Sequence, residues 1–393
     1  MGQNPKSEIR NPKSKRLVPL LLDWFAANAR DLPWRRTRDP YAIWVSEIML
    51  QQTQVKTVIP FWERWLRELP TIEAAAKAPS AKIHKLWEGL GYYTRVRNLQ
   101  KAAQAIVKHH DGKFPENFDE VLALPGIGRY TAGAICSIAF NQPKPILDGN
   151  VIRVLTRIFG IADNPKEKAA NAKLWQLAEA LVSIAGEIGG ARLRRAQIKS
   201  HGSTESRHTQ KETCSHLNQS LMELGALICT PRNPQCLICP VKKLCVAFKE
   251  NRTAELPNLG KREAATARRF VAFVVEHGGK FLVRQRPAQV VNAHLWEFPN
   301  VEVGVRLCEP QEFWAEFAAL PANDPRSENL ERLCIVKHSI TRYRITLEAF
   351  FVQLKNAPAE NGGIWQTSAR LKNLAFTSAH RKVLRAVIAR AGN

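Results

Sequence analysis

A glycine-rich break between two helical stretches restricts the fold of this chain more than any other feature. Residues 124–132 read LPGIGRYTA, and the flanking segments Phe118–Leu122 and Thr131–Ala139 have helical patterns. The sequence therefore predicts a helix, a tight hairpin and a second helix. Glycines at 126 and 128 would let backbone N–H groups at a helix N-terminus approach a phosphate oxygen. An ordinary helix–helix connection is the simpler explanation of this short pattern alone.

A single carboxylate follows the second of these helices. Asp148 begins the turn Asp148-Gly149-Asn150 after a short apolar run; alone, it would read as a turn residue or a helix cap. A hairpin followed by a lone aspartate resembles the helix-hairpin-helix DNA glycosylase superfamily, in which Asp148 would match the catalytic aspartate. Superfamily members that also cut the DNA backbone carry a lysine at the position of Tyr130 to form a Schiff base. The resemblance therefore implies a monofunctional glycosylase.

The charge of the chain indicates its partner. Lysine and arginine number 58 against 35 acidic residues, a formal net charge of +23 over 393 residues. Such an excess favours nucleic acid as the ligand, and the length allows two or three domains. The sequence has no long apolar stretch, signal peptide or basic amphipathic anchor. We expect a cytoplasmic, nucleoid-associated prokaryotic protein that acts as a monomer on double-stranded DNA, with no membrane association.

The segment from Tyr41 to Gln54 carries a second candidate carboxylate. Helical spacing predicts that Glu47, Gln51 and Gln54 share one polar stripe, which is most often a solvated face. Yet residues 44–54, WVSEIMLQQTQ, resemble the adenine glycosylase (MutY) family, whose members carry this glutamate in nearly the same string. The resemblance implies base excision repair of adenine mispaired with 8-oxoguanine or guanine.

The chemistry of that reaction requires two carboxylates in different protonation states. Adenine is a poor leaving group, so a general acid of raised pKa must protonate a ring nitrogen; Glu47 is the candidate. The sugar then becomes an oxocarbenium-like cation, which an ionised Asp148 would stabilise. Sugar hydrolases use the same pair of groups, and glycosylases first extrude the target base from the duplex.

Further site residues follow from the family resemblance alone. The resemblance implies DNA intercalation or recognition by Leu50, Gln52, Thr53 and Tyr92, and an adenine or attacking-water pocket formed by Arg35, Tyr130, Asn150 and Gln219. It also implies phosphate contacts from the hairpin residues Gly126, Gly128 and Tyr130. For an aromatic residue such as Tyr92, packing in the core is the alternative.

Four of the eight cysteines have the spacing of metal ligands. They are Cys229, Cys236, Cys239 and Cys245. Four thiolates at these positions would bind zinc or a [4Fe–4S] cluster, and zinc is the commoner answer from chemistry alone. The spacing resembles the cluster loop of the glycosylase family, which implies a [4Fe–4S] cluster of structural role.

Composition divides the chain into segments. The sequence predicts a disordered basic tail at residues 1–16. Residues 17–250 are expected to form the helix-hairpin-helix glycosylase domain, with its cluster loop at 229–245. Within that domain, residues 186–212 predict a flexible insertion. A polar linker at residues 251–267 precedes the last domain.

Residues 268–393 predict an α+β domain. Alternating apolar strands are expected at Phe270–Glu276, Lys280–Gln285, Leu333–Val336 and Ile345–Val352, with a closing helix at Ser378–Ala391. The strings FLVRQRP and LWEFP resemble the Nudix-like C-terminal domain of adenine glycosylases. No run of spaced glutamates that would bind magnesium is present, so the resemblance implies recognition of 8-oxoguanine opposite the adenine. Where the family usually has Phe-Ser-His, this chain has Ile340-Thr341-Arg342; we expect Thr341 and Arg342 to contact the lesion.

Two other readings compete with an adenine glycosylase. A thymine-mismatch glycosylase of the same superfamily also has a tyrosine at the hairpin in some members, but Glu47 in its string and the Nudix-like domain argue against it. A non-catalytic lesion-binding protein would have no need for both Glu47 and Asp148.

Overall fold

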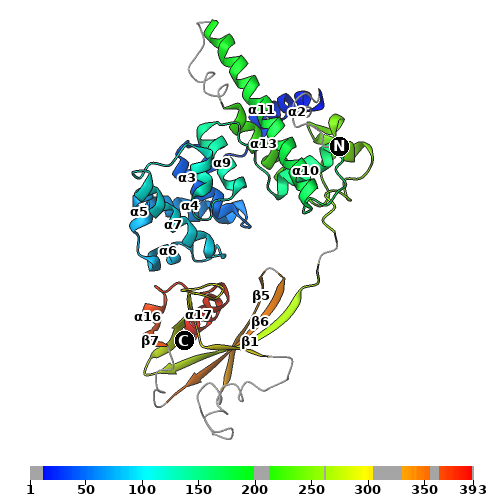
Figure 1. Cartoon of the computed structure of the whole chain (residues 1–393). Helices are drawn as coiled ribbons and strands as arrows, with labels where there is room; N and C mark the ends of the chain where they lie inside the picture. Colours follow the sequence, from blue (N-terminus) through cyan, green and yellow to red (C-terminus); the bar gives the residue numbers. More distant parts are fainter. Residues whose placement is uncertain are drawn as a thin grey trace. The chain divides into compact units, whose positions relative to one another are not determined.

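The computed structural model describes residues 12–198, 212–260, 263–303, 330–340, 342–354 and 363–391. The chain forms two compact units, drawn in Figure 1. The helical unit contains Met1–Lys77 and Asn98–Arg262, and the β unit contains Ala78–Arg97 and Glu263–Asn393. The sequence did not predict that a segment of the expected glycosylase domain would group with the C-terminal residues.

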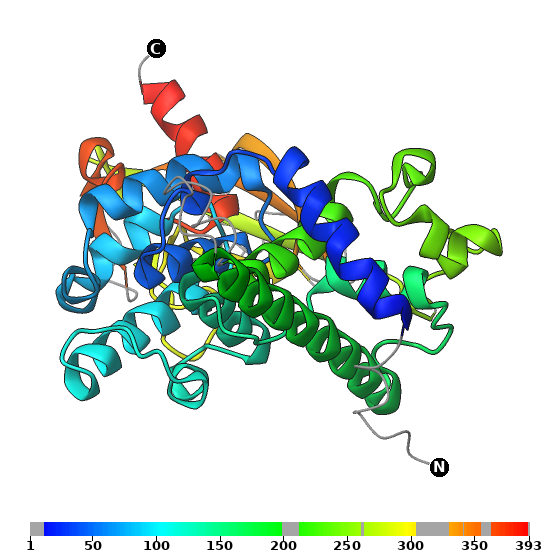
Figure 2. The same cartoon turned by 90° about the horizontal axis from the view of Figure 1, so that it is seen from above.

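The helical unit is built almost entirely from α-helices. In chain order the elements are α2 (Pro12–Asn28), η1 (Pro33–Arg35), α3 (Pro40–Leu50), α4 (Val55–Glu68), α5 (Ile72–Lys77), α7 (Thr94–His109, which starts in the β unit), α8 (Phe118–Ala123), α9 (Arg129–Phe140), α10 (Gly149–Phe159), α11 (Lys168–Ile198), α13 (Thr213–Leu227), η2 (Cys236–Ile238), η3 (Lys242–Leu244) and α14 (Val246–Lys249). Helix α11 is 31 residues long and stands out in green in Figure 2.

Helices α8 and α9 confirm the predicted helix-hairpin-helix. The side chain of Asn117 caps α8 by accepting the N–H groups of Asp119 and Glu120. Gly126 has a φ of +76°, and a Cβ there would lie 2.5 Å from the Cβ of Asn98. Only glycine fits this turn without strain. Gly128 then caps α9.

Helix α13 lies at the centre of the helical unit. It contacts α2, α9, α10 and α11, and most of its side chains are buried. The surrounding core consists mainly of leucine, isoleucine, valine and alanine. Because α13 is buried on several sides, its polar residues face neighbouring helices rather than water. Such residues can form hydrogen bonds with the side chains of those helices.

The predicted bounds of the N-terminal tail and of the insertion are wrong. Helix α2 begins at Pro12, so residues 12–16 are not part of a disordered tail; Lys13 donates to the carbonyl of Ile158. Helix α11 continues to Ile198, so residues 186–198 are helical rather than a flexible insertion. Alanine, arginine and glutamate in that stretch are good helix formers, and they outweigh the glycines at 186, 189 and 190. Residues 1–11 and 199–211 lie outside the described residues.

The predicted linker is partly packed onto the helical unit. Leu256 is buried in a small cluster with Cys245 and Ala247, and its carbonyl accepts a hydrogen bond from Arg157. The helical unit therefore extends to about residue 260 rather than ending at 250.

The β unit is a seven-stranded sheet with helices. Its elements are α6 (Ser80–Trp87), β1 (Thr266–His277), β2 (Lys280–Gln285), β3 (Trp296–Glu297), β4 (Asn300–Val303), β5 (Glu331–Ile340), β6 (Tyr343–Gln353), β7 (Ile364–Thr367), α16 (Ser368–Leu371) and α17 (Ser378–Ala391). The order is β3-β2-β1-β6-β5, with β4 paired to β1 and β7 to β2. The predicted strands and closing helix are confirmed.

Strand β1 shows the period-two pattern of a strand buried on both faces. Ala272 and Val274 belong to the cluster that contains α17 residues, whereas Val271, Phe273 and Val275 belong to the cluster on the other face. Within this unit, the segment 78–97 is attached by hydrogen bonds: the N–H of Phe376 donates to the Glu88 carboxylate at 3.0 Å.

Within the described part of the chain, no helix combines the length and the apolar character needed to cross a membrane.

Candidate active site

Glu47 lies on the inner side of α3 and is only 5% exposed. Asp39 caps the helix by accepting the N–H of Tyr41, and the helix ends at Leu50. The predicted polar stripe is therefore wrong: the helix stops before Gln51, and Gln54 is the N-cap of α4. Glu47 is instead a buried carboxylate, which a solvated face would not provide.

The partner of Glu47 comes from the hairpin. Tyr130, in the first turn of α9, donates its hydroxyl to Oε2 of Glu47 at 2.8 Å. Burial raises the pKa of Glu47 from 4.5 to about 7; the charge of Asp148 adds to the rise, while Tyr130 and the charge of Arg35 oppose it. Burial, and then the charges of Glu47 and Asp148, also raise the pKa of Tyr130 well above its ordinary value. The tyrosine therefore remains a hydrogen-bond donor.

Asp148 is held by its own helix. Its Oδ1 accepts the N–H of Val151 at 2.8 Å, which makes it the N-cap of α10. Its Oδ2 accepts the side-chain amide of Asn150 at 3.0 Å. The sequence allowed either a cap or a catalytic carboxylate. The structure shows the cap, and Asp148 is also close enough for its charge to raise the pKa of Glu47.

A chain of hydrogen bonds joins Asp148 to the cysteine loop. Arg153 donates Nη2 to Oδ1 of Asn150 at 2.8 Å and Nε to the carbonyl of Cys229 at 2.7 Å. Its Nη2 also lies 2.7 Å from the carbonyl of Gly225. Sequence reasoning missed Arg153, although its position three residues after Asn150 puts both on one helix face.

Helices α10 and α13 approach closely at this point. A Cβ on Gly225 would lie 2.7 Å from the Cβ of Asn150 and 3.2 Å from its carbonyl oxygen. Any larger residue would displace Asn150. The glycine thus allows the contact that fixes the asparagine beside Asp148.

The two predicted base-pocket residues are bonded to each other. Arg35 donates Nε to the side-chain oxygen of Gln219 at 3.0 Å, and Gln219 donates to Ser215 at 3.0 Å. Gln219 is 6% exposed. Arg35 also forms an ion pair with Glu223 at 2.9 Å, a residue that sequence reasoning missed.

The predicted intercalating residues lie in loops with unusual backbone. Gln52 is exposed and has a φ of +59°, and it follows Leu50 and precedes Thr53 in the turn after α3. In the β unit, Tyr92 is 44% exposed with a φ of +48°. A non-glycine residue in this region costs of the order of 1–3 kcal/mol, and such residues concentrate at functional sites.

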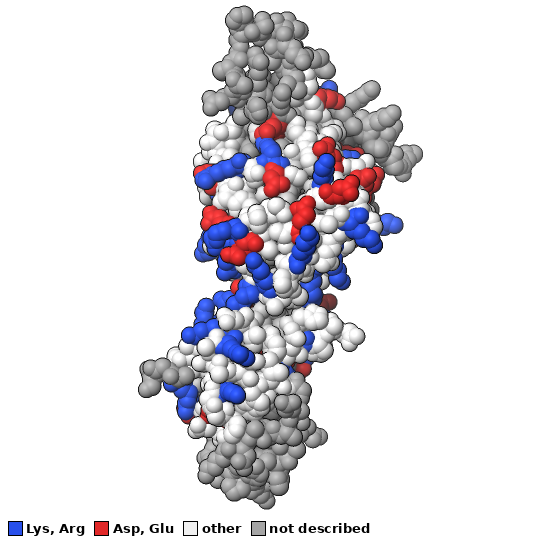
Figure 3. Space-filling view, turned by 90° about the vertical axis from the view of Figure 1, so that its left-hand side faces the viewer, with Lys and Arg blue, Asp and Glu red and all other residues white. Residues whose placement is uncertain are grey.

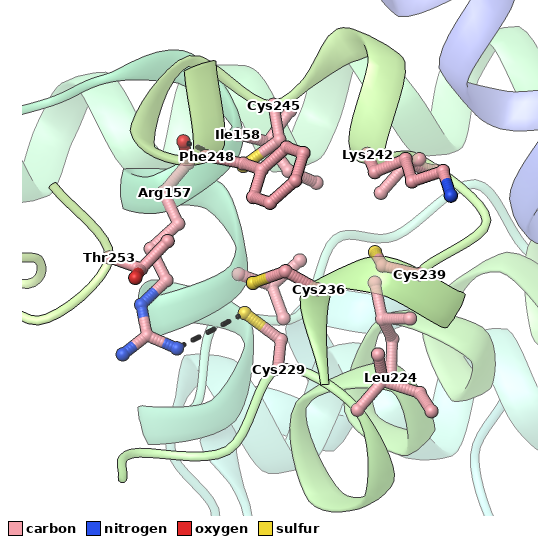
Figure 4. Close-up of a pocket in the computed structure, with 13 residues that line it drawn as sticks. Arg157, Ile158, Leu224, Cys229, Cys236, Cys239, Lys242, Cys245, Phe248 and Thr253 are labelled. Carbon is pink, nitrogen blue, oxygen red and sulfur yellow. Dashed lines mark hydrogen bonds between the residues drawn. The ribbon is translucent and has the colours of Figure 1, made fainter. Parts of the chain in front are cut away.

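The four predicted cysteine ligands line one pocket, which Figure 4 shows. Apolar residues such as Val154, Ile158 and Leu224 form much of its wall. Burial, and to a smaller degree the charges of the neighbouring sulfurs, raise the pKa of the Cys239 thiol to about 11 against a backbone hydrogen bond that lowers it. Thiolates in such a pocket need a compensating cation, and a metal cluster supplies one.

A buried arginine supports the first of these cysteines. Arg157 is 2% exposed, and its Nη1 lies 3.4 Å from Sγ of Cys229, as Figure 4 marks. The same guanidinium donates to the carbonyls of Thr230 and Leu256. Arg157 thereby ties the cysteine loop to the segment that follows it.

The remaining predicted residues are those of the hairpin and those expected to contact the lesion. Gly126 and Gly128 are exposed at the hairpin. The Tyr130 hydroxyl, in contrast, points inward to Glu47, so a phosphate contact of this residue would come from its backbone N–H rather than from its side chain. Arg342 is exposed and its Nη1 lies 3.9 Å from Oε2 of Glu263; Thr341 lies outside the described residues.

Three family models match the chain. Residues 45–180 match the HhH-GPD superfamily of base excision DNA repair proteins, residues 229–245 the iron–sulfur binding domain of endonuclease III, and residues 270–386 a NUDIX domain. These matches confirm the predicted fold and the iron–sulfur cofactor.

Known proteins are similar over most of the chain. An adenine DNA glycosylase of Mus musculus is 33% identical over 93% of this chain and 76% of its own. One of Buchnera aphidicola subsp. Schizaphis graminum is 34% identical over 74% of this chain and 76% of its own. A solved thermostable thymine-DNA glycosylase is 30% identical with a TM-score of 0.50, over 61% of this chain and 99% of its own. These similarities show that the chain, whose helical unit holds a buried glutamate, a capping aspartate and a cysteine pocket, belongs to the adenine DNA glycosylase family, enzymes of base excision repair.

Proposed function

We propose that this enzyme removes adenine mispaired with 8-oxoguanine or guanine by hydrolysing its N-glycosidic bond, acting as a monomer on double-stranded DNA. One observation carries the proposal: Glu47 is buried, is hydrogen-bonded by Tyr130 and has a pKa raised to about 7. A carboxyl group of this kind is protonated at neutral pH often enough to serve as a general acid.

In this mechanism Glu47 gives its proton to a ring nitrogen of adenine. The bond between the base and the sugar then breaks, and the electron pair leaves with the base. Asp148 stabilises the positive charge that develops on the sugar. Water then forms a bond to the cationic sugar carbon and gives up a proton to the carboxylate left at Glu47, and Arg153 positions Asn150 beside Asp148. Arg35 and Gln219 contact the extruded base.

The enzyme should stop after releasing the base. Schiff-base formation requires an amine, and Tyr130 supplies a phenol whose hydroxyl is bound to Glu47. Tyr130 therefore orients the acid and does not attack the sugar.

DNA contact is distributed over several elements. We assign a phosphate oxygen to the backbone of Gly126 and Gly128, and entry into the base stack to Gln52 and Tyr92, with Leu50 and Thr53 beside Gln52. Lysine and arginine side chains on the face shown in Figure 3 add to the formal charge of +23 that attracts the duplex.

The four cysteines at 229, 236, 239 and 245 would hold the [4Fe–4S] cluster. When bound, the cluster orders the loop and takes no part in hydrolysis. Arg232, Lys242 and Lys243 on that loop then meet phosphates, while the carbonyl of Cys229 holds Arg153.

Metal analysis tests the cluster assignment. Protein purified without air should be yellow-brown and contain about four iron and four sulfide ions per chain. Cys236→Ser should lose most of the visible absorbance, whereas Cys334→Ser, outside the pocket, should retain it. Stoichiometric zinc without visible absorbance would contradict the assignment.

The β unit is proposed to read the base opposite adenine. Arg342 is exposed next to Tyr343, with its guanidinium 5.4 Å from the centre of that ring. A guanidinium there can donate to a base edge or to a phosphate.

Arg342→Ala distinguishes these two contacts. If Arg342 reads the oxidised guanine, the variant should lose about 1–3 kcal/mol of preference for 8-oxoguanine over guanine. If it binds only phosphate, both mispairs weaken equally. Dissociation constants for both mispairs, measured with an uncleavable adenine analogue at two salt concentrations, separate the outcomes. Unchanged affinity for both would remove Arg342 from the interface.

The opposite-base specificity has a direct test. Single-turnover rates should be measured on duplexes with adenine opposite 8-oxoguanine, guanine, cytosine and thymine, followed by alkali. We expect the first two to react fastest and strand breaks to appear only after alkali. A duplex with thymine opposite guanine completes the set, because the solved thymine-DNA glycosylase is similar to this chain. Preferential release of thymine, or strand breaks without alkali, would refute the proposal.

A further inference from the structure

A second buried carboxylate lies behind the base pocket, and no step of the reaction above uses it. Glu223 in α13 is 1% exposed. Its two oxygens accept five N–H groups: the backbone N–H, Nε and Nη2 of Arg30, and Nη1 and Nη2 of Arg35, at 2.7–3.2 Å. Both arginines are therefore held by one carboxylate.

This arrangement fixes the direction of the Arg35 side chain. Its two terminal nitrogens are bound to Glu223, and Nη1 also donates to the carbonyl of Arg30 at 3.0 Å. On the pocket side, Nε donates to Gln219. Without Glu223, Arg35 would lose two of its bonds and its orientation.

The same arginine acts electrostatically on the candidate acid. The charged or titratable groups that influence Glu47 are Tyr130 from α9, Asp148 at the start of α10 and Arg35 from η1. Arg35 favours the ionised form of Glu47, and Asp148 opposes it. The net charge around Arg35 consequently matters for whether Glu47 keeps its proton.

Stability alone does not explain the cluster. Burying charges carries a desolvation cost, and well-packed apolar residues are often equally or more stabilising. Burial opposes the ionised form of Glu223, but the hydrogen bonds from Arg30 and Arg35 prevail and lower its pKa to about 2. Glu223 is therefore a fixed negative charge at every pH at which the enzyme would be assayed.

We propose that Glu223 is a positioning residue for adenine excision, which holds Arg35 against Gln219 and offsets the arginine charge felt by Glu47. This inference rests on the proposed function, because it takes Glu47 as the acid. Arg30 is the outer partner that balances the cluster at one net positive charge, from two arginines and one carboxylate.

The sign of the effect can be worked out for two substitutions. Glu223→Gln raises the cluster charge by one, which favours ionised Glu47 and lowers its pKa. Arg30→Gln lowers the cluster charge by one and raises that pKa. Because a general acid loses activity as pH rises through its pKa, the alkaline limb of the pH–rate profile should move to lower pH in the first variant and to higher pH in the second.

The experiment measures single-turnover adenine release against pH, on a duplex with adenine opposite 8-oxoguanine. We expect Glu223→Gln to shift the alkaline limb by about one pH unit to lower pH, a roughly tenfold rate loss on that limb. Arg30→Gln should shift it the opposite way, and Glu223→Asp, which keeps the charge, should restore the limb. Asp31→Asn breaks the exposed ion pair with Arg36 and is the matched control; its limb should coincide with that of the wild type.

The outcomes separate this inference from the proposed function. A lower rate in Glu223→Gln with an unmoved limb would mean a merely structural role and would overturn the inference alone. If Glu223→Gln fails to fold, as thermal melting would reveal, a limb in Arg30→Gln that does not move upward overturns it equally. A wild-type profile without an alkaline limb would overturn Glu47 as the acid, and the inference with it.

Discussion

Replacing Glu47 with glutamine should lower the single-turnover rate of adenine release by roughly 10³-fold or more at neutral pH, since proton transfer by a positioned acid contributes 10²–10⁴-fold. The amide cannot give a proton to the departing base, yet its oxygen can still accept the hydroxyl of Tyr130. Binding of a duplex with an uncleavable adenine analogue should change little, because the lost interaction exists only in the transition state.

The same variant should be at least as stable as the wild type above neutral pH. The pKa of Glu47 is raised in the folded state from 4.5 to about 7, so its contribution to stability is greatest at low pH and declines as pH rises through about 7. At pH 8 the buried ionised carboxylate costs up to about 3 kcal/mol, which glutamine removes. Thermal melting at pH 5 and pH 8 measures this difference.

The control for this variant is Glu63→Gln, which neutralises an exposed glutamate on α4. It should keep the wild-type rate. The wild-type rate itself should fall as pH rises through about 7, where Glu47 loses its proton. Near-normal turnover by Glu47→Gln, or a wild-type rate that increases across that range, would exclude Glu47 as the acid.

Local sequence signals were sufficient to predict the main elements of the fold. The proline and glycines of residues 124–128 interrupt a helical pattern, and the bounds of α8 and α9 lie within two residues of those predicted. Period-two alternation likewise predicted β1, β2, β5 and β6. Spacing identified the cysteines, since ligands close in sequence must lie close in space.

The predictions from sequence are wrong where contacts with distant parts of the chain determine the end of a helix or its burial. Helical spacing predicts a polar stripe that includes Glu47, because spacing alone does not show that α3 ends at Leu50 or that the helix is buried. The sequence predicts a flexible insertion from residue 186 because glycines and arginines occur there without apolar spacing, whereas α11 continues to Ile198 and the alanines, leucine and arginines of this stretch favour helix.

The missed site residues share one property. Arg153, Arg157 and Glu223 are charged, buried and bonded to groups far away in the chain: Arg153 and Arg157 reach the loop at Cys229, and Glu223 binds Arg30. Single-sequence patterns assign charged residues to the surface. Only the folded chain shows that these three hold the site together.

Asp148→Asn should lower adenine release by roughly 10³-fold or more, because it removes the charge that opposes the developing cation, while the fold is retained. Asparagine is as good an N-cap as aspartate, so its oxygen can still accept the N–H of Val151. The melting temperature should therefore stay near that of the wild type, which separates lost chemistry from lost structure.

A second consequence of this substitution follows from the hydrogen-bond chain. With its oxygen on Val151, the new amide of residue 148 would present N–H groups to the side-chain amide of Asn150, which now donates to Asp148. Asn150 cannot simply turn over, because its oxygen accepts Nη2 of Arg153. Asp148→Glu keeps the negative charge but moves it by the length of one methylene group. Asn150→Ala keeps Asp148 and removes the side-chain amide that would face the new amide at residue 148. If charge dominates, Asn150→Ala should retain far more activity than Asp148→Asn in the single-turnover assay; equal losses in the two variants would instead assign the effect to the asparagine and its contacts.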